Sequence, residues 1–134
     1  MFAIKKILCP TDLSESSYRV FDLGNEMALN LCAELILLTV IVPDPNIMGL
    51  EGFNINITGY LQEIKVSTFN LLLEMKKKFL SGKVKSRSIV SLGRPADQIL
   101  RAANYENVDI ILIARRKLIG WRRLIFGSVS ESVV

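Results

Sequence analysis

Residues 35–42 read Leu-Ile-Leu-Leu-Thr-Val-Ile-Val, a run of strand length in which Thr39 is the only polar residue. A strand with one face in water alternates apolar and polar residues, whereas continuous apolarity indicates burial on both faces. Strands buried in this way belong to parallel sheets, because the connecting helices cover both sides. The stretch therefore predicts an inner strand of an α/β protein.

Three further apolar runs predict strands on either side of this one. They end at Pro10, span 84–92 and span 110–114, and the second alternates loosely, which suits a more exposed position. Between the strands, apolar residues spaced three and four apart predict helices. Strands that alternate with helices imply a doubly wound parallel sheet with right-handed crossovers.

The helices carry recognisable end signals. The first is predicted from Ser14, as its N-cap, to Leu31; the second covers 61–79, with Lys76, Lys77 and Lys78 in a last turn where positive charge suits the helix dipole. The third is predicted to begin at Pro95 and to end at Asn107. Residues 43–59 are rich in Pro, Gly and Asn and are interpreted as an irregular loop.

The amino-acid composition excludes several classes of function. The chain has 134 residues, of which 50% are hydrophobic, and its 17 basic residues exceed its 13 acidic ones by four. This fits one globular domain without membrane insertion or nucleic-acid binding. The absence of histidine excludes Ser-His-Asp and Cys-His catalysis and histidine-based metal sites. Cys9 and Cys32 are interpreted as small core residues in a reducing compartment, so we expect a cytoplasmic protein. Because histidine-based catalysis is excluded, we expect the protein to act by binding.

Two loops follow strands that flank the expected switch point of the sheet. The first contains Asp12, which can accept hydrogen bonds from a ribose or cap the following helix. The second, residues 115–127, holds five of the basic residues and ends at Gly127-Ser128, which is typical of an anion site at the start of a helix. This pattern fits either a phosphate-binding loop or a loop that is charged only because it is exposed to solvent. Trp121 and Phe126, which stand among the arginines, also suit stacking on a base or docking of a partner protein.

A set of short motifs resembles the universal stress protein family over nearly the whole chain. They are Lys6-Ile7-Leu8 before Pro10-Thr11-Asp12 and Ser14-Glu15-Ser16, Leu37 to Val40, Gly93 with Pro95, Asp109 to Leu112, and Leu124 to Val129 followed by Glu131. The resemblance implies a Rossmann-like, three-layer α/β/α fold of the adenine nucleotide alpha-hydrolase-like type, with strand order 3-2-1-4-5. It further implies that Pro10, Thr11, Asp12 and Val40 are nucleotide-binding positions, with Asp12 and Val40 at those that contact ribose and adenine.

Some members of this family bind the phosphates of ATP through glycine, two residues, glycine, nine residues, then glycine and Ser or Thr. Gly127 and Ser128, followed by Val129, match the end of this pattern, but Ala114 and Lys117 replace the first two glycines. A lysine cannot freely take the backbone conformations open to glycine, although its charge can contact a phosphate. The resemblance therefore implies that the protein binds an adenine nucleotide and that Mg²⁺ accompanying the nucleotide is the only metal. The altered glycines imply that the triphosphate is held weakly or not at all.

The end of the chain also departs from the family. The family continues through a full helix into a fifth strand that often mediates dimerisation, whereas this sequence stops at Val134. We expect residues 1–134 to form a single domain that lacks the fifth strand, either as a fragment or half of a tandem protein, or with the edge of the fourth strand unprotected.

The leading hypothesis is a dimeric regulatory module of the stress response that binds a nucleotide or a protein partner without turnover. One alternative is an ATP-binding family member with slow ATPase activity, in which Asp12 helps to hold a metal–phosphate complex. Another is the amino-terminal half of a tandem protein that docks a partner through the loop from Arg115 to Arg123.

Overall fold

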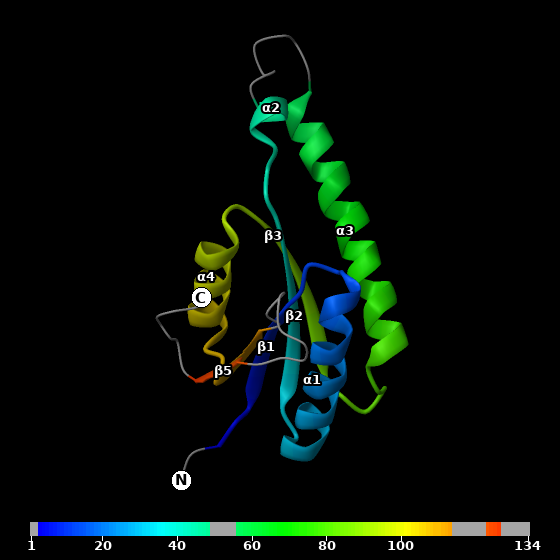
Figure 1. The fold of residues 1–134 in the computed structure, drawn as a ribbon, viewed down its shortest axis with the longest axis vertical. Helices are drawn as coiled ribbons and strands as arrows, with labels where there is room; N and C mark the ends of the chain where they lie inside the picture. Colours follow the sequence, from blue (N-terminus) through cyan, green and yellow to red (C-terminus); the bar gives the residue numbers. More distant parts are fainter. Residues whose placement is uncertain (1–2, 49–55, 114–122, 127–134) are drawn as a thin grey trace.

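The computed structural model describes residues 3–48, 56–113 and 123–126, and they form a sheet covered by helices on both faces (Figure 1). The strands stand in the order β3-β2-β1-β4-β5. Their bounds are β1 Lys6–Pro10, β2 Glu34–Ile41, β3 Ser86–Leu92, β4 Ile110–Ile113 and β5 Arg123–Phe126. The pairs β1–β2, β2–β3 and β1–β4 are parallel, which confirms the doubly wound parallel sheet and the order 3-2-1-4.

The helices lie in two layers. Their bounds are η1 Glu15–Ser17 (a 3₁₀ turn), α1 Tyr18–Leu31, α2 Pro45–Met48, α3 Ile57–Phe79 and α4 Pro95–Glu106. Helices α1 and α3 cover one face of the sheet and α4 covers the other (Figure 1). None of the helices in the described part of the chain has the length and apolar character needed to cross a bilayer.

Two apolar cores follow from the alternation of side chains along the strands. Leu35 and Leu37 of β2 face Phe21 of α1 and Leu72 of α3. The intervening residue Ile36 and its neighbours on that face pack against α4. Leu35 through Leu38 are each 0% exposed, so the continuous apolar run in the sequence does correspond to a strand buried on both faces.

The predicted start and end of the last helix are confirmed. Pro95 is the first residue of α4, where its missing N–H costs no hydrogen bond. Asn107 ends the helix in the left-handed conformation, with φ = 55°. The lysines 76–78 occupy the last turn of α3, also as predicted.

The sheet has a fifth strand where a basic loop was expected, so the alternative of an unprotected edge on the fourth strand is wrong. The backbone of Arg123–Phe126, which the sequence placed in a basic loop, pairs antiparallel with β4, with Ile110 opposite Phe126. The exposed edge of an apolar strand favours pairing with more backbone, and Leu124-Ile125-Phe126 has the composition of a strand. Within the described residues β4 therefore does not form the edge of the sheet.

The first helix begins later than predicted. Ser14 is followed by η1, and α1 starts at Tyr18. The Ser14 hydroxyl does not accept a bond from a helix amide; it donates to Asp12 Oδ1 instead. Side chains of this kind readily bond their neighbours in loops, which competes with helix capping.

The segment 43–59 is more regular than predicted. Pro45–Met48 form α2, and α3 already begins at Ile57. Asn56 caps α3, because its Oδ1 accepts a hydrogen bond from Gly59 N at 2.8 Å.

The two cysteines differ from each other. Cys9 is a buried core residue as predicted, and burial raises the pKa of its thiol to about 12. Cys32 is exposed, so its assignment to the core was wrong. It follows α1 in the left-handed conformation with φ = 55°, where the chain turns toward β2.

Thr39 is 5% exposed, and its hydroxyl has no hydrogen-bond partner among the described residues. A buried hydroxyl without a partner loses its hydration and gains nothing in return. We expect Thr39→Val, which keeps the shape of the side chain, to raise the free energy of unfolding by about 1 kcal/mol in urea denaturation.

Thr11→Val is the matched control for this prediction. Thr11 is 8% exposed, but its hydroxyl donates to Ser17 Oγ at 2.8 Å and accepts from Leu13 N at 2.9 Å. The same substitution should lower the free energy of unfolding here by about 1–3 kcal/mol, because two partners lose their bonds. A destabilising Thr39→Val would contradict the prediction.

Candidate functional site

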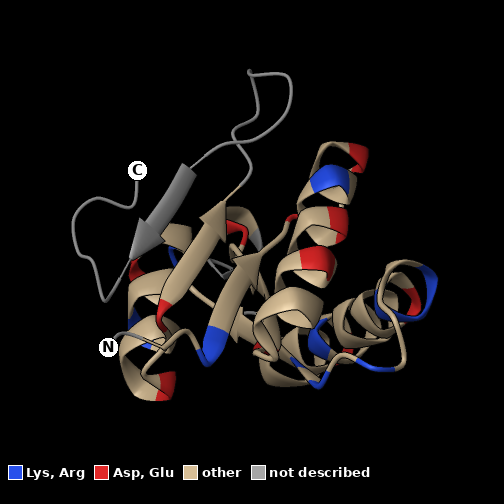
Figure 2. Ribbon diagram, turned by 90° about the horizontal axis from the view of Figure 1, so that it is seen from below, with Lys and Arg blue, Asp and Glu red and all other residues tan. Residues whose placement is uncertain are grey.

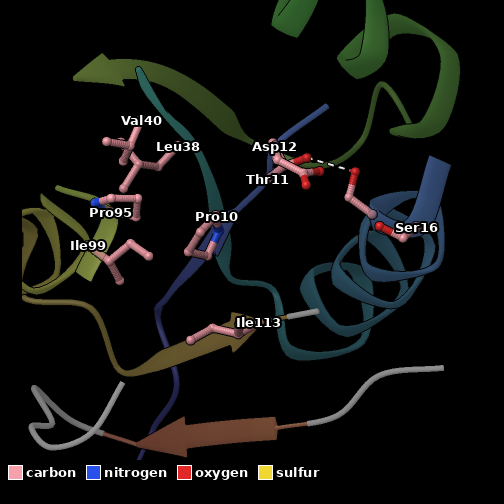
Figure 3. A pocket seen from close by; sticks show the side chains of 10 residues that line it. Pro10, Thr11, Asp12, Ser16, Leu38, Val40, Pro95, Ile99 and Ile113 are labelled. Atoms are coloured by element: carbon pink, nitrogen blue, oxygen red, sulfur yellow. Dashed lines mark hydrogen bonds between the residues drawn. The ribbon is translucent and has the colours of Figure 1, made fainter. Parts of the chain in front are cut away.

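A pocket of about 200 Å³ opens at the carboxyl ends of β1, β2 and β4, beside the start of α4. Strand β1 lies between β2 and β4 at the point where the chain changes direction across the sheet, and ligands of doubly wound sheets bind at such points. The lining residues are Pro10, Thr11, Asp12, Ser16, Ser17, Leu38, Val40, Pro95, Ile99 and Ile113. The apolar side chains lie together on one side of the pocket and the polar ones on the other (Figure 3).

The polar side is built by a loop that bonds to itself. Thr11 N donates to Leu38 O at 2.8 Å, which extends the pairing of β1 and β2 beyond the end of β1. Thr11 Oγ1 then donates to Ser17 Oγ, which in turn donates to Ser14 O at 2.7 Å. These bonds connect the end of β1 to the start of α1, so the polar wall is positioned before any ligand arrives.

Leu13 holds a strained backbone conformation in this loop. Its φ of 66° lies in the left-handed region, which a leucine rarely adopts. The Leu13 amide is bonded to Thr11 Oγ1, and the side chain packs against the core beneath α1 and α3. Strain that the surroundings maintain in this way is common in loops that form binding sites.

Asp12 is exposed at the rim of the pocket. Its Oδ1 accepts hydrogen bonds from both the backbone N and the hydroxyl of Ser14. Asp12 therefore organises the turn that leads into η1. It does not cap the following helix, which was one of the two roles expected for it, because the N-cap residue is Ser14. Its place in the pocket wall keeps the other role, a contact with a ligand hydroxyl, geometrically open.

The structure brings together four of the residues singled out from the sequence. Pro10, Thr11, Asp12 and Val40 all line the pocket. Lys117, Gly127, Ser128 and Val129 lie outside the described residues, as does Ala114.

Sequence reasoning missed the residues that complete the pocket. Leu38 and Ile113 lie at or near the ends of β2 and β4, and the rule that ligands bind at the carboxyl ends of strands would have included them. Pro95 and Ile99 were assigned to a helix, but no local signal indicated that the first turns of this helix cover the pocket.

The strongest charge interactions lie away from the pocket. Arg87 binds Glu34 at 2.9 Å and also binds Glu106, which joins β3, β2 and the end of α4. The hydrogen bond from Arg87 lowers the pKa of Glu106, and the two carboxylates raise that of Arg87. Within the described residues, no three side chains of His, Cys, Asp or Glu are grouped so as to hold a metal ion.

The fold and the pocket together define a three-layer, Rossmann-like α/β module with a small site at its switch point. Residues 3–134 match the universal stress protein family, and the chain belongs to this family.

Individual relatives agree with this assignment. Universal stress protein MJ0577 of Methanocaldococcus jannaschii is 27% identical, over 97% of this chain and 88% of its own. Its solved structure superposes with a TM-score of 0.72 over 90% of this chain and 81% of that one, at 26% identity. Universal stress protein YxiE of Bacillus subtilis is 29% identical, over 96% of this chain and 90% of its own.

A universal stress protein crystallised in complex with cAMP shares the fold. Its TM-score is 0.58 at 19% identity, over 85% of this chain and 75% of that one.

Proposed function

We propose that this protein is a regulatory module that binds the nucleoside part of an adenine nucleotide in the pocket and acts through binding, without turnover. The observation that carries the proposal is the apolar wall formed by Val40, Pro95, Ile99 and Ile113, next to a polar wall. A purine ring has two flat faces that favour such an apolar surface, while its ribose needs polar partners.

The polar wall supports the ribose part of the proposal. A carboxylate accepts hydrogen bonds from ribose hydroxyls, and Asp12 lies at the carboxyl end of β1, beside the switch point where ligands of doubly wound sheets bind. Asp12 is also the one carboxylate among the described residues that line the pocket. Phosphate hydrolysis also needs a metal ion or a base that activates water, and among the described lining residues only Asp12 offers such a group, so we propose a binding role.

The phosphate-binding glycine pattern of the family is altered in this sequence. Ala114 and Lys117 stand where two family glycines allow close approach of the backbone to phosphate. We therefore propose that most of the affinity for a nucleotide comes from its nucleoside part.

This proposal predicts that phosphates add little affinity. In isothermal titration calorimetry, adenosine should bind with a dissociation constant on the order of 100 µM. ATP with Mg²⁺, AMP and cAMP should each bind within about threefold of that value. ATP binding more than about thirtyfold tighter than adenosine binding would show that the phosphate site is intact and would contradict the prediction.

The altered glycine positions provide the matching control. Ala114→Gly combined with Lys117→Gly should strengthen ATP binding and leave adenosine binding unchanged, because the change concerns the phosphate end. Adding Gly127→Asp should remove that gain, since a carboxylate there repels the phosphates.

A further inference from the structure

A second concave surface lies at the opposite end of the sheet, where the strands begin. It comprises a cavity of about 690 Å³ and an adjoining one of about 640 Å³, which share Lys85. Their lysines come from the start of β1, the last turn of α3 and the segment between α3 and β3. We call this surface the lysine groove, after Lys5, Lys6, Lys76, Lys77, Lys83 and Lys85. Figure 2 views the protein from this end and shows basic positions gathered there.

The acidic side chains near the lysine groove, Glu34, Glu106 and Asp109, offset only part of its positive charge. Glu34 and Glu106 both bind Arg87, and Asp109 Oδ2 accepts hydrogen bonds from the backbone N of Lys5 and Lys6. Among the described residues none of the six lysines forms a salt bridge. Lys6 Nζ donates to a backbone carbonyl, Glu106 O, at 2.9 Å.

The floor of the groove is apolar. Ala28 and Ala33 lie buried beneath it, and Leu29 lines it while remaining 40% exposed. An apolar strip with a cationic rim is complementary to a partner that has apolar and acidic side chains on one face.

We propose that the lysine groove binds an acidic, amphipathic segment of a partner protein. The apolar floor would receive aliphatic side chains and the lysines would pair with carboxylates, so the two features act together. Nucleic acid fits less well, because surfaces that bind single strands add aromatic side chains for stacking and no described lining residue is aromatic. The groove lies at the opposite end of the sheet from the nucleotide pocket, so both sites can be occupied at once.

The test uses a fluorescein-labelled peptide of about five helical turns, with leucine on one face and glutamate elsewhere. In fluorescence anisotropy we expect a dissociation constant on the order of 10 µM at low salt. Charge reversal in Lys83→Glu with Lys85→Glu should weaken binding at least about tenfold. The matched control, Arg19→Glu with Arg101→Glu, makes the same change in net charge at two exposed arginines elsewhere and should alter binding less than about twofold.

Cys32 gives a second readout that locates the peptide. It is exposed in the groove, whereas Cys9, the other cysteine of the chain, is buried, so alkylation of the native protein by neutral iodoacetamide reports on Cys32. Bound peptide should slow this reaction in the wild type and in the arginine control. Three results would each overturn the proposal: no saturable binding up to about 1 mM, equal losses in both double variants, or double-stranded DNA binding as tightly with the same dependence on the lysines.

Discussion

Val40→Asp is expected to weaken adenosine binding at least about a hundredfold, because it places a charge in the apolar wall of the pocket. Val40 extends the buried strand β2 into that wall, next to Leu38 and facing the first turns of α4 (Figure 3). A carboxylate there would have to lose water when the purine binds, and no described basic side chain lines the pocket to compensate it. Calorimetric titration of adenosine measures the effect.

Val42→Asp is the matched control for Val40→Asp. Val42 stands two residues further along the chain, is 61% exposed and does not line the pocket. The same change of charge there should leave adenosine affinity within about twofold of the wild type. Equal losses in both variants would mean that charge at this end of the protein, and not the apolar wall, determines binding.

Leu37→Ala is expected to lower the free energy of unfolding by about 3 kcal/mol. Leu37 is 0% exposed and lies in the middle of the sheet, with Cys9 of β1 and Ser88 of β3 in register beside it. Truncation removes apolar contacts and leaves a cavity beneath α1 and α3, which the paired strands cannot close by moving. Urea denaturation, followed by circular dichroism, measures the loss.

Leu71→Ala provides the comparison for this stability prediction. Leu71 lies on α3 next to buried Leu72 but is 51% exposed. Its replacement should cost less than about 1 kcal/mol, and alanine favours a helix. A loss equal to that of Leu37→Ala would contradict the assignment of β2 as the buried centre of the fold.

The parts of the fold that could be predicted from sequence are those with strong local patterns. The run 35–42 identified a strand buried on both faces, and Pro95 and Asn107 marked the start and end of α4, because each signal acts within a few residues. Strand β5 could not be predicted in this way. Its pairing depends on the free edge of β4, which is a distant part of the sequence, and its apolar residues stand among arginines.

The residues of the candidate site also divide into those that the sequence could predict and those that it could not. Pro10, Thr11 and Asp12 lie at the end of the first predicted strand and Val40 lies near the end of the second, so the topology brings them to the same end of the sheet, but the family resemblance was needed to single them out. The strained turn at Leu13 and the bonds from Thr11 to Ser17 depend on side-chain geometry that no spacing reveals.

The lysine groove also could not be predicted from the sequence. Lys76 and Lys77 read as a solvated helix end, because the other lysines of the groove come from segments far away in the chain. The fold brings these segments together where the strands begin.

The central claim, that the pocket at the switch point holds an adenine nucleoside, is tested most directly by nuclear Overhauser contacts between unlabelled adenosine and the methyl groups of isotopically labelled protein. The account predicts contacts from the purine protons to the methyl groups of Val40, Ile99 and Ile113. Contacts confined to methyl groups elsewhere, such as those of Leu29 at the other end of the sheet, or saturating adenosine without any such contact, would contradict it.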